Sequence, residues 1–366
     1  MEIKVLVISD YREFLMVRPE AEIFLGLKRE GLDITVMTYP GTIYGERFKE
    51  AGIRVIEFHP EKKFHGPSIQ FIRKELQEGG YHILQLFNSK AFSNGIRAAR
   101  NIPVKVVLYR GYKGHFHWYD PAMYLKYLHP RVDKIICVTK AIEEDIKKHS
   151  IFVKHKGVTI LKGHDLNWFR DVRPANLSVQ SNIPAGAFVI ICVANVRPMK
   201  GIPYLLKATH FLPENEPIHF LFAGKGFDKP GIQKMIGQSP FREKIHCIGY
   251  TADPLPLVAA ADIFIMPSIK GEGLNKAVLE AMALGVAPVI TDIPGNEELV
   301  TDNLNGLMVP ARNPRALADA ISKLYKDGEL RKRLGINARE HIRTRLNLET
   351  TIQETKALYT QLASEL

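Results

Sequence analysis

The sequence predicts an α/β protein built from two doubly wound parallel sheets. Short β-branched runs alternate with longer amphipathic segments along most of the 366 residues. This alternation is typical of parallel strands joined by helices. The length is enough for two domains at roughly 100 to 200 residues each. Ligands of such sheets bind beyond the carboxyl ends of the strands, so we expect two Rossmann-like domains that face each other across a deep cleft.

Six strands are expected in the first domain, residues 1–172. They are residues 4–8, 34–38, 54–58, 83–86, 104–108 and 134–138. Between the first two, the apolar residues Ala21, Phe24, Leu25 and Leu27 share one face of a helix that stops near Gly31. Strand, helix and strand in this order form a βαβ unit.

The second domain, residues 173–345, repeats the pattern with strands at 188–194, 219–223, 245–248, 263–266 and 287–291. Residues 171–187 are rich in Pro, Gly, Asn and Ser, which predicts an interdomain linker. Residues 346–366 form a terminal helix with an apolar stripe at Ile352, Leu358 and Leu362. Because that stripe needs a partner, we expect the helix to pack back on the first domain.

The positive charge is concentrated in one region. The net charge is +11, and residues 60–160 contain 18 Lys and Arg against 8 Asp and Glu, an excess of ten. Nucleic acid, an anionic membrane or a phosphorylated acceptor would each fit such a region, and lysines dispersed over solvated faces are the simpler alternative. Basic and aromatic residues crowd together between 107 and 118, which favours an anionic partner.

The cysteine pattern indicates the reducing cytoplasm. Cys137, Cys192 and Cys247 each lie in or beside a short apolar run, so we expect buried, inert thiols. Their number is odd, their spacing is not that of zinc ligands, and the first residues form a strand rather than a secretory signal. No apolar stretch approaches the 18 residues of a membrane span.

The most informative segment is KGEGLNKAVLEAMA at 270–283, which follows an apolar strand and opens a helix. The amides of Gly273, Leu274 and Asn275 would lie at the helix N-terminus, where a phosphate is favoured, with Gly273 allowing the tight turn. Glu272 in the loop and Glu280 in the helix repel phosphate and suit the hydroxyls of a ribose or sugar ring. An ordinary helix start with nearby acidic residues is the alternative.

A second cluster follows the first strand of the second domain. Arg197 and Lys200 can neutralise a departing diphosphate from there. The chain contains no D-x-D motif, the usual device for holding a divalent ion on a diphosphate, so no metal is expected. Two surface cations beside a turn are the simpler interpretation.

The E-x7-E element from Glu272 to Glu280, with residues 284–292, 297–300 and 306–309, resembles the donor-binding half of the retaining GT-B glycosyltransferases. This large family includes phosphatidylinositol mannosyltransferases, lipopolysaccharide core glucosyltransferases and sucrose synthases. The resemblance runs from about residue 189 to 324. It implies a GT-B fold in which Glu280 holds the nucleotide ribose, Glu272 holds the transferred sugar, and the amides after Glu272 hold the diphosphate or sugar. It also implies that the turn with Gly224 and Gly226 lies near the nucleotide and that Tyr250 lies near the base.

The sequence departs from the family pattern at two places. Many members carry Gly-Arg five residues before the Lys-Gly, where this chain has Asn195, and we expect Arg197 to supply that charge. Arg110 occupies the position where many relatives have a His beside the reacting sugar. Because an arginine stays charged, Arg110 cannot act as a base, but it can stabilise a phosphate. His115 and His117 are titratable alternatives to Arg110 in catalysis. A structural role for each is the simpler interpretation. Further candidates on the acceptor side are Lys113 and Arg18, although Arg18 and Pro19 are equally consistent with an ordinary helix start.

The resemblance implies a retaining, metal-independent hexosyltransferase, EC 2.4, that uses a UDP- or GDP-linked sugar as co-substrate and no other cofactor. We expect an envelope glycan or glycolipid acceptor of the lipopolysaccharide, O-antigen or capsule type, since residues 110–139 resemble transferases of surface polysaccharide assembly. The protein would be cytoplasmic, peripheral on the inner membrane face, with no nucleic-acid partner. A nucleotide-sugar epimerase or hydrolase on the same fold is the alternative, and a non-catalytic polyanion-binding protein is a remote one.

Overall fold

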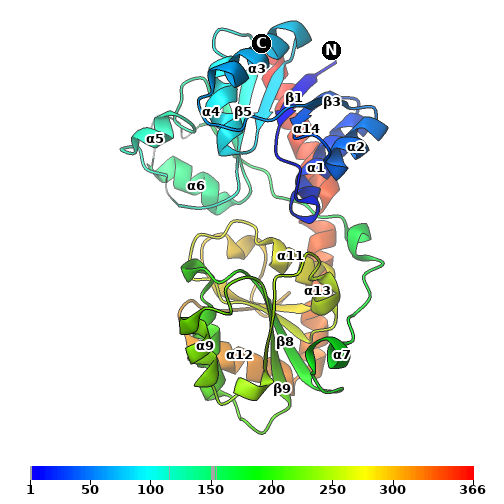
Figure 1. Ribbon diagram of the computed structural model, residues 1–366, viewed down its shortest axis with the longest axis vertical. Coiled ribbons are helices and arrows are strands. Elements are labelled where there is room, and N and C mark those ends of the chain that lie inside the picture. The colour runs from blue at the N-terminus through cyan, green and yellow to red at the C-terminus, as the bar shows by residue number, and fades with distance from the viewer. Residues whose placement is uncertain (1, 115, 150–152, 154) are drawn as a thin grey trace. The chain divides into compact units, whose positions relative to one another are not determined.

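A computed structural model describes the chain except residues 1, 115, 150–152 and 154. The chain divides into two compact units: Met1–His164 together with Leu346–Leu366, and Asp165–Arg345. Each unit is a parallel sheet with helices on both faces (Figure 1). The predicted fold class, two Rossmann-like α/β units, is therefore confirmed. The first unit ends at His164, earlier than the predicted boundary at residue 172.

The first unit contains a seven-stranded sheet in the order β3-β2-β1-β4-β5-β6-β7. Its strands are β1 (Lys4–Ile8), β2 (Asp33–Thr38), β3 (Arg54–Glu57), β4 (Ile83–Leu86), β5 (Lys105–Arg110), β6 (Lys134–Cys137) and β7 (Gly157–Thr159). All pairs are parallel. Six strands were predicted; β7 was missed because three residues at a sheet edge are too short to show a period.

Helices cover both faces of the first sheet. Figure 1 shows α1, α2 and α14 on one side and α3 and α4 on the other. The helices are α1 (Phe14–Arg29), α2 (Ile43–Glu50), α3 (Gly66–Gly79), α4 (Ser89–Ala98), α5 (Pro121–Tyr124), α6 (Lys140–His149) and α14 (Leu348–Ser364). The prediction that Pro19 starts α1 was wrong: the helix begins at Phe14 and Pro19 lies inside it. Among the described residues, no helix combines the length and apolar character that crossing a membrane requires.

Helix α14 is held in the first unit by close packing and polar contacts. An added Cβ at Gly26 in α1 would meet the Ile352 side chain at 2.1 Å, so glycine lets the two helices approach. The Tyr359 hydroxyl donates to Gln85 Oε1 on β4 at 2.8 Å, and both side chains are buried. At the base of α14, the His164 amide donates to the Leu346 carbonyl at 2.8 Å.

The second unit contains a six-stranded parallel sheet in the order β10-β9-β8-β11-β12-β13. Its strands are β8 (Phe188–Val193), β9 (Ile218–Ala223), β10 (Ile245–Gly249), β11 (Ile263–Met266), β12 (Ala287–Asp292) and β13 (Leu307–Pro310). Its α-helices are α7 (Leu177–Ser181), α8 (Ile202–Ala208), α9 (Pro230–Gly237), α10 (Leu255–Ala259), α11 (Lys276–Ala283), α12 (Pro314–Lys326) and α13 (Gly328–Thr344). Strand β13 was not predicted.

Two further expectations are corrected in this unit. The segment predicted as a linker, 171–187, contains α7, which the Asn176 side chain caps by accepting from the Val179 amide. The Ala175 amide also donates to the Pro256 carbonyl at 2.9 Å, so the segment is part of the second unit. Cys247 is exposed, because β10 is an edge strand, whereas Cys137 and Cys192 are buried as expected.

Candidate functional site

The strand order of the second sheet reverses between β8 and β11. From β8 the chain proceeds outward to β9 and β10, and from β11 it proceeds in the other direction to β12 and β13. Ligands of doubly wound sheets bind at such a point, beyond the carboxyl ends of the strands. The loops after these two strands are joined there, since the Ile269 amide donates to the Met199 carbonyl at 2.8 Å.

Two glycines allow the loops at these strand ends to approach each other. Gly201 has a φ of 65°, and an added Cβ would lie 1.9 Å from the Pro267 carbonyl oxygen. Gly224 has a φ of 146°, and its added Cβ would lie 2.1 Å from the Ala194 carbonyl oxygen. A side chain at either position would therefore push backbone against backbone, and glycine is required.

An ion pair connects the two loops. Lys200 Nζ lies 2.7 Å from Glu272 Oε1, and the Ser268 hydroxyl donates to the same oxygen at 2.5 Å. Only 7% of Glu272 is exposed. Among the described residues no hydrogen bond to Glu272 Oε2 is found, so this oxygen can accept a hydrogen bond from a ligand hydroxyl. The Lys200 ammonium group likewise retains two further N–H donors. Sequence reasoning missed Ser268, although its place directly after an apolar strand was a usable signal.

The turn before α11 differs from the prediction in one detail. The left-handed residue is Gly271, with a φ of 75°, and not Gly273. Asn275 is the N-cap of α11, because its Oδ1 accepts from the Ala277 amide at 3.1 Å. Its Nδ2 is buried, and no acceptor for it is found within the described part of the chain. An unsatisfied buried donor costs about 1–3 kcal/mol, which a ligand acceptor would recover.

Glu280 lies inside α11, buried, and forms an ion pair with Lys276 one helical turn earlier. Lys276 is the first residue of the helix, where a positive charge opposes the helix dipole, and the pair with Glu280 offsets that effect. Lys276 was not among the predicted site residues, although its i,i+4 spacing to Glu280 was visible.

The loops after β8, β9 and β10 also contact one another. Asn195 Oδ1 accepts from the Lys225 amide at 2.8 Å, and the Gly224 amide donates to the Gly249 carbonyl at 2.7 Å. Lys225 Nζ lies 4.7 Å from the centroid of the Tyr250 ring, which is 59% exposed. Gly226, with a φ of 91°, completes the turn after β9. These loops present an exposed aromatic ring beside a cation, at the same edge of the sheet as the Lys200–Glu272 pair.

The structure brings together part of the predicted cluster. Lys200 and Glu272 are in direct contact, and Glu280 pairs with Lys276 on the helix that follows. Arg197 is the N-cap of the short 3₁₀ turn Pro198–Lys200 and its side chain is exposed. Within the described residues the Arg197 side chain forms no hydrogen bond or ion pair, so it is free to reach a ligand.

Arg110, in the first unit, ends β5 and is completely buried. Its Nη2 donates to the Gly114 carbonyl at 2.7 Å, and its guanidinium lies 4.7 Å from the Tyr127 ring and 4.8 Å from the Tyr112 ring. Nε and Nη1 have no hydrogen-bond partner among the described residues. In this conformation the Arg110 charge is enclosed by aromatic rings rather than presented to solvent.

The other first-unit candidates lie on loops and on α1. Lys113 is half-buried, and the His117 ring stacks on the Tyr119 ring at 5.0 Å. The Arg18 guanidinium lies 5.1 Å from the Phe14 ring. His115 lies outside the described residues.

Glu20 lies on α1 next to the carboxyl end of β1, and the sequence predicted only that it belongs to a stretch, residues 18–20, that could line the acceptor side. The Ser9 hydroxyl donates to its carboxylate. Burial raises the pKa of the Glu20 carboxyl to about 7, an effect that the Ser9 hydrogen bond and the charge of Lys162 reduce only in part. The sequence indicates that Glu20 lies in a helix, but it does not indicate that its carboxyl is buried.

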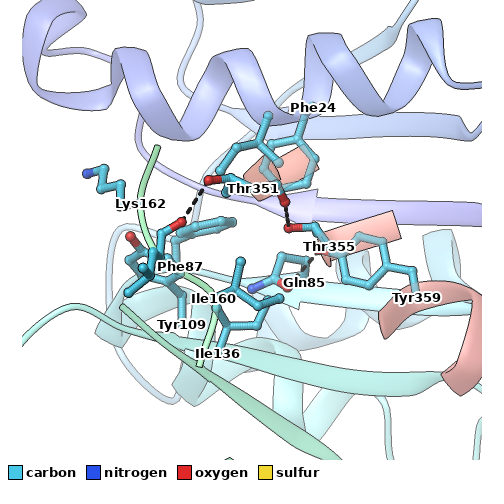
Figure 2. A pocket seen from close by; sticks show the side chains of 12 residues that line it. Phe24, Gln85, Phe87, Tyr109, Ile136, Ile160, Lys162, Thr351, Thr355 and Tyr359 are labelled. Atoms are coloured by element: carbon cyan, nitrogen blue, oxygen red, sulfur yellow. Dashed lines mark hydrogen bonds between the residues drawn. The ribbon is translucent and has the colours of Figure 1, made fainter. Parts of the chain in front are cut away.

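Figure 2 shows a small cavity in the first unit, around which lie Tyr109, Lys162 and Tyr359. Residues of α14, among them Thr351 and Thr355, close one side of it. Its volume of about 20 Å³ is enough for a water molecule and too small for a sugar. The strand ends of the second unit therefore remain the best candidate site.

The chain belongs to the glycosyltransferases of GT-B fold. Residues 175–341, in the second unit, match the family described as Glycosyl transferases group 1. Residues 21–168, in the first unit, match the family described as Glycosyltransferase Family 4. The two matches correspond closely to the two structural units.

Several curated glycosyltransferases are similar in sequence. An uncharacterized glycosyltransferase of Methanocaldococcus jannaschii is 26% identical over 65% of this chain and 61% of its own. The lipopolysaccharide core biosynthesis glycosyltransferase LpsE of Rhizobium meliloti is 26% identical over 57% and 58%. The N,N'-diacetylbacillosaminyl-diphospho-undecaprenol alpha-1,3-N-acetylgalactosaminyltransferase of Campylobacter jejuni is 27% identical over 56% and 48%. The chain thus matches about half to three fifths of the length of these relatives.

Solved structures share the fold over the whole chain. A glycosyltransferase from Rickettsia africae has a TM-score of 0.83 at 17% identity, covering 99% of this chain and 98% of its own. HepE of Anabaena in complex with UDP has a TM-score of 0.79 at 18% identity, covering 98% and 100%.

Proposed function

We propose that the protein transfers a hexosyl group from a nucleoside diphosphate sugar to a glycan or glycolipid acceptor. The observation that carries the proposal is the Lys200–Glu272 pair, which joins the ends of β8 and β11 where the strand order reverses. A cation for phosphate and a carboxylate oxygen for hydroxyls lie side by side there. HepE, which has the same fold, has been solved in complex with UDP, and this supports a nucleotide-linked donor.

Each group at the strand ends has a place in this proposal. Lys200 and Arg197 neutralise the diphosphate, together with the amides before α11 and the unsatisfied Nδ2 of Asn275. Glu272 Oε2 accepts from a hydroxyl of the transferred sugar, and Glu280 accepts from the ribose. Tyr250 offers its exposed ring to the base.

The reaction requires charge stabilisation more than a protein nucleophile. The acceptor oxygen forms a bond to the anomeric carbon, the bond from that carbon to the phosphate oxygen breaks, and the diphosphate leaves with the electron pair. On a front-face path the leaving phosphate oxygen takes the acceptor proton, which retains the anomeric configuration. Lys200 and Arg197 then stabilise the developing phosphate charge without a bound metal ion.

The acceptor proposal follows from the relatives and from the charge. One relative is named for lipopolysaccharide core synthesis and another for a diphospho-undecaprenol acceptor. An anionic envelope glycan or lipid-linked glycan fits the ten excess positive charges between residues 60 and 160. We propose that the protein works in the cytoplasm, peripheral on the inner membrane face, where such acceptors are assembled.

A thermal-shift panel tests the donor site. UDP, GDP, ADP and CMP sugars are added in the presence of a chelator, and one nucleotide class should raise the melting temperature. Glu280→Gln should weaken binding of both the free nucleotide and its sugar. Glu272→Gln should remove the extra affinity due to the sugar, roughly 10- to 100-fold, and spare the free nucleotide. Lys270→Ala, an exposed residue of the same loop, is the matched control. Stabilisation that disappears with the chelator contradicts the metal-free mechanism.

Turnover assays test the chemistry. Lys200→Ala should keep the fold and lower sugar transfer by roughly 10²- to 10³-fold, as expected for loss of a charge-stabilising group. Wild-type transfer by this variant would contradict the proposal. Incubation with nucleotide sugar alone separates transfer from the alternative reaction, because an epimerase or hydrolase would consume the sugar rapidly without an acceptor.

A further inference from the structure

The segment after β5 exposes an unusual number of large apolar side chains. Trp118 is 58% exposed, Tyr119 66%, Tyr124 43%, and Leu125 40%. Trp118 and Tyr119 are in contact, with ring centroids 6.0 Å apart. The same segment is anchored from beneath by buried Met123, so its shape is set by the fold. Single exposed apolar residues are normal, but four within eight positions indicate an interaction surface.

Lysines border these rings. Lys126 directly follows Leu125; burial lowers its pKa, the positive charge of Lys63 lowers it further, and the carboxylate of Asp120 raises it. Between residues 111 and 131 the sequence has one carboxylate, Asp120, and its Oδ1 is engaged as the N-cap of α5, accepting from the Ala122 amide at 2.9 Å. The surface formed by Trp118, Tyr119, Tyr124, Leu125, Lys63 and Lys126, here called the α5 face, is therefore aromatic and net positive.

The positive surface continues beyond the α5 face. The Arg97 guanidinium lies 4.2 Å from the ring of Phe64, which is next to Lys63 and is 44% exposed. Arg97 also lines an open hollow together with Arg100 and His129. Arg97 and Arg100 thus add positive charge beside Phe64 and along this hollow.

We propose that the α5 face docks the first unit on an anionic lipid bilayer. Trp and Tyr rings are favoured at the level of the headgroups, where the ring is apolar and its polar atom stays hydrated. Lysines beside them are attracted by anionic headgroups, with their apolar stems against the rings. The inference rests on the proposed function, since an enzyme acting on a lipid-linked acceptor works at a membrane surface.

Single-stranded nucleic acid is the competing partner for aromatic and basic residues, and the geometry disfavours it. Stacking of successive bases needs open ring faces along a groove. The Trp118 and Tyr119 rings meet at 81°, and one face of Tyr119 is already stacked on His117. Leu125 has no ring to stack. The bilayer is the partner that uses all members of the face.

Fluorescence of Trp118 tests the proposal on the full chain. The sequence has two tryptophans, so Trp168→Phe leaves Trp118 as the single reporter. Vesicles of phosphatidylcholine with phosphatidylglycerol should shift its emission to the blue, and brominated lipid chains should quench it. Vesicles of phosphatidylcholine alone should do so much less, and salt should weaken the effect. Equal responses to both vesicles, or none, overturn the proposal.

Matched variants separate the α5 face from general charge. Lys63→Glu with Lys126→Glu should weaken binding to phosphatidylglycerol vesicles by at least about tenfold. Lys234→Glu with Lys332→Glu changes the net charge equally at exposed positions of the second unit and should leave binding unchanged. Leu125→Ser should weaken binding, whereas Ile336→Ser, which changes a residue that is 59% exposed on α13, should not.

Two further measurements distinguish the bilayer from competing partners. A change of Trp118 emission with inorganic phosphate or single-stranded RNA, and none with vesicles, would make the face a soluble-ligand site and overturn the proposal. Nucleotide-sugar stabilisation is measured on the same proteins. Retained stabilisation without vesicle binding refutes the docking surface alone, and vesicle binding without nucleotide-sugar stabilisation refutes the proposed donor site alone.

Discussion

Replacing Gly201 by alanine tests the close approach of the loops after β8 and β11. The new Cβ would lie 1.9 Å from the Pro267 carbonyl oxygen, so the loops must separate by roughly 1 Å to reach 3.0 Å. The φ of 65° adds a left-handed penalty of about 1–2 kcal/mol, and the forced shift adds about 1–3 kcal/mol. We therefore expect the second unit to lose about 2–5 kcal/mol. At about 2–4 °C per kcal/mol for a unit of this size, its melting temperature should fall by roughly 4–20 °C.

Calorimetry with and without nucleotide sugar measures this effect. The shift should also weaken the ligand-induced stabilisation, because Lys200 precedes Gly201 and its 2.7 Å contact with Glu272 depends on the same approach. Gly231→Ala in α9 is the matched control: nothing lies within 4 Å of its added Cβ, so its stability should be unchanged or slightly higher. A Gly201→Ala protein that melts with the wild type, or a control that falls as far, would refute the packing argument.

Three other predictions concern single side chains. Asn275→Ser keeps the helix cap and should lower the free energy of unfolding by under about 0.5 kcal/mol, whereas Asn275→Ala should lower it by about 1 kcal/mol. Both variants lack the amide donor, so both should weaken nucleotide-sugar binding. Affinity equal to that of the wild type would exclude a role of the Asn275 amide in binding. The Glu20 pKa is raised from 4.5 to about 7, so the folded state binds the extra proton and stability falls as pH rises from about 4.5 to 7. Glu20→Gln should flatten this fall and melt higher than the wild type at pH 8; an unchanged pH profile would contradict it. Tyr359→Phe leaves Gln85 Oε1 without its 2.8 Å donor and should cost about 1–3 kcal/mol in chemical denaturation, with no change expected in nucleotide-sugar binding.

The parallel-sheet fold was predictable because its central strands are continuous apolar runs. Strands such as β1 and β11 are buried on both faces and were placed to the residue. Strands at the edges, β7 and β13, were missed because they have only three and four residues and are only partly buried. The polar segment 171–187 was interpreted as a linker because α7, with five residues, is too short to show a helical period.

The candidate site was predictable for the residues whose place directly after a strand or at a helix start indicates ligand binding. Glu272 was chosen to hold a sugar hydroxyl and Lys200 to neutralise a diphosphate, both in loops that follow strands, and the structure places the two in contact. Ser268, which donates to Glu272, and Lys276, which pairs with Glu280, were not chosen, because only the folded site shows which neighbouring side chain a carboxylate contacts. The left-handed turn was assigned to Gly273 and lies at Gly271, since the sequence alone does not say which of two nearby glycines reverses the chain.

The return of α14 to the first unit affects how the chain can be synthesised and folded. The second unit, Asp165–Arg345, is continuous, so it can complete its fold as soon as it has left the ribosome. The first unit is made earlier, yet the contacts of Gly26 with Ile352 and of Gln85 with Tyr359 can form only after α14 has been translated, some two hundred and fifty residues or more later. The part synthesised first is therefore finished last, and until then it exposes an uncovered apolar helix face to the chaperones that attend nascent chains.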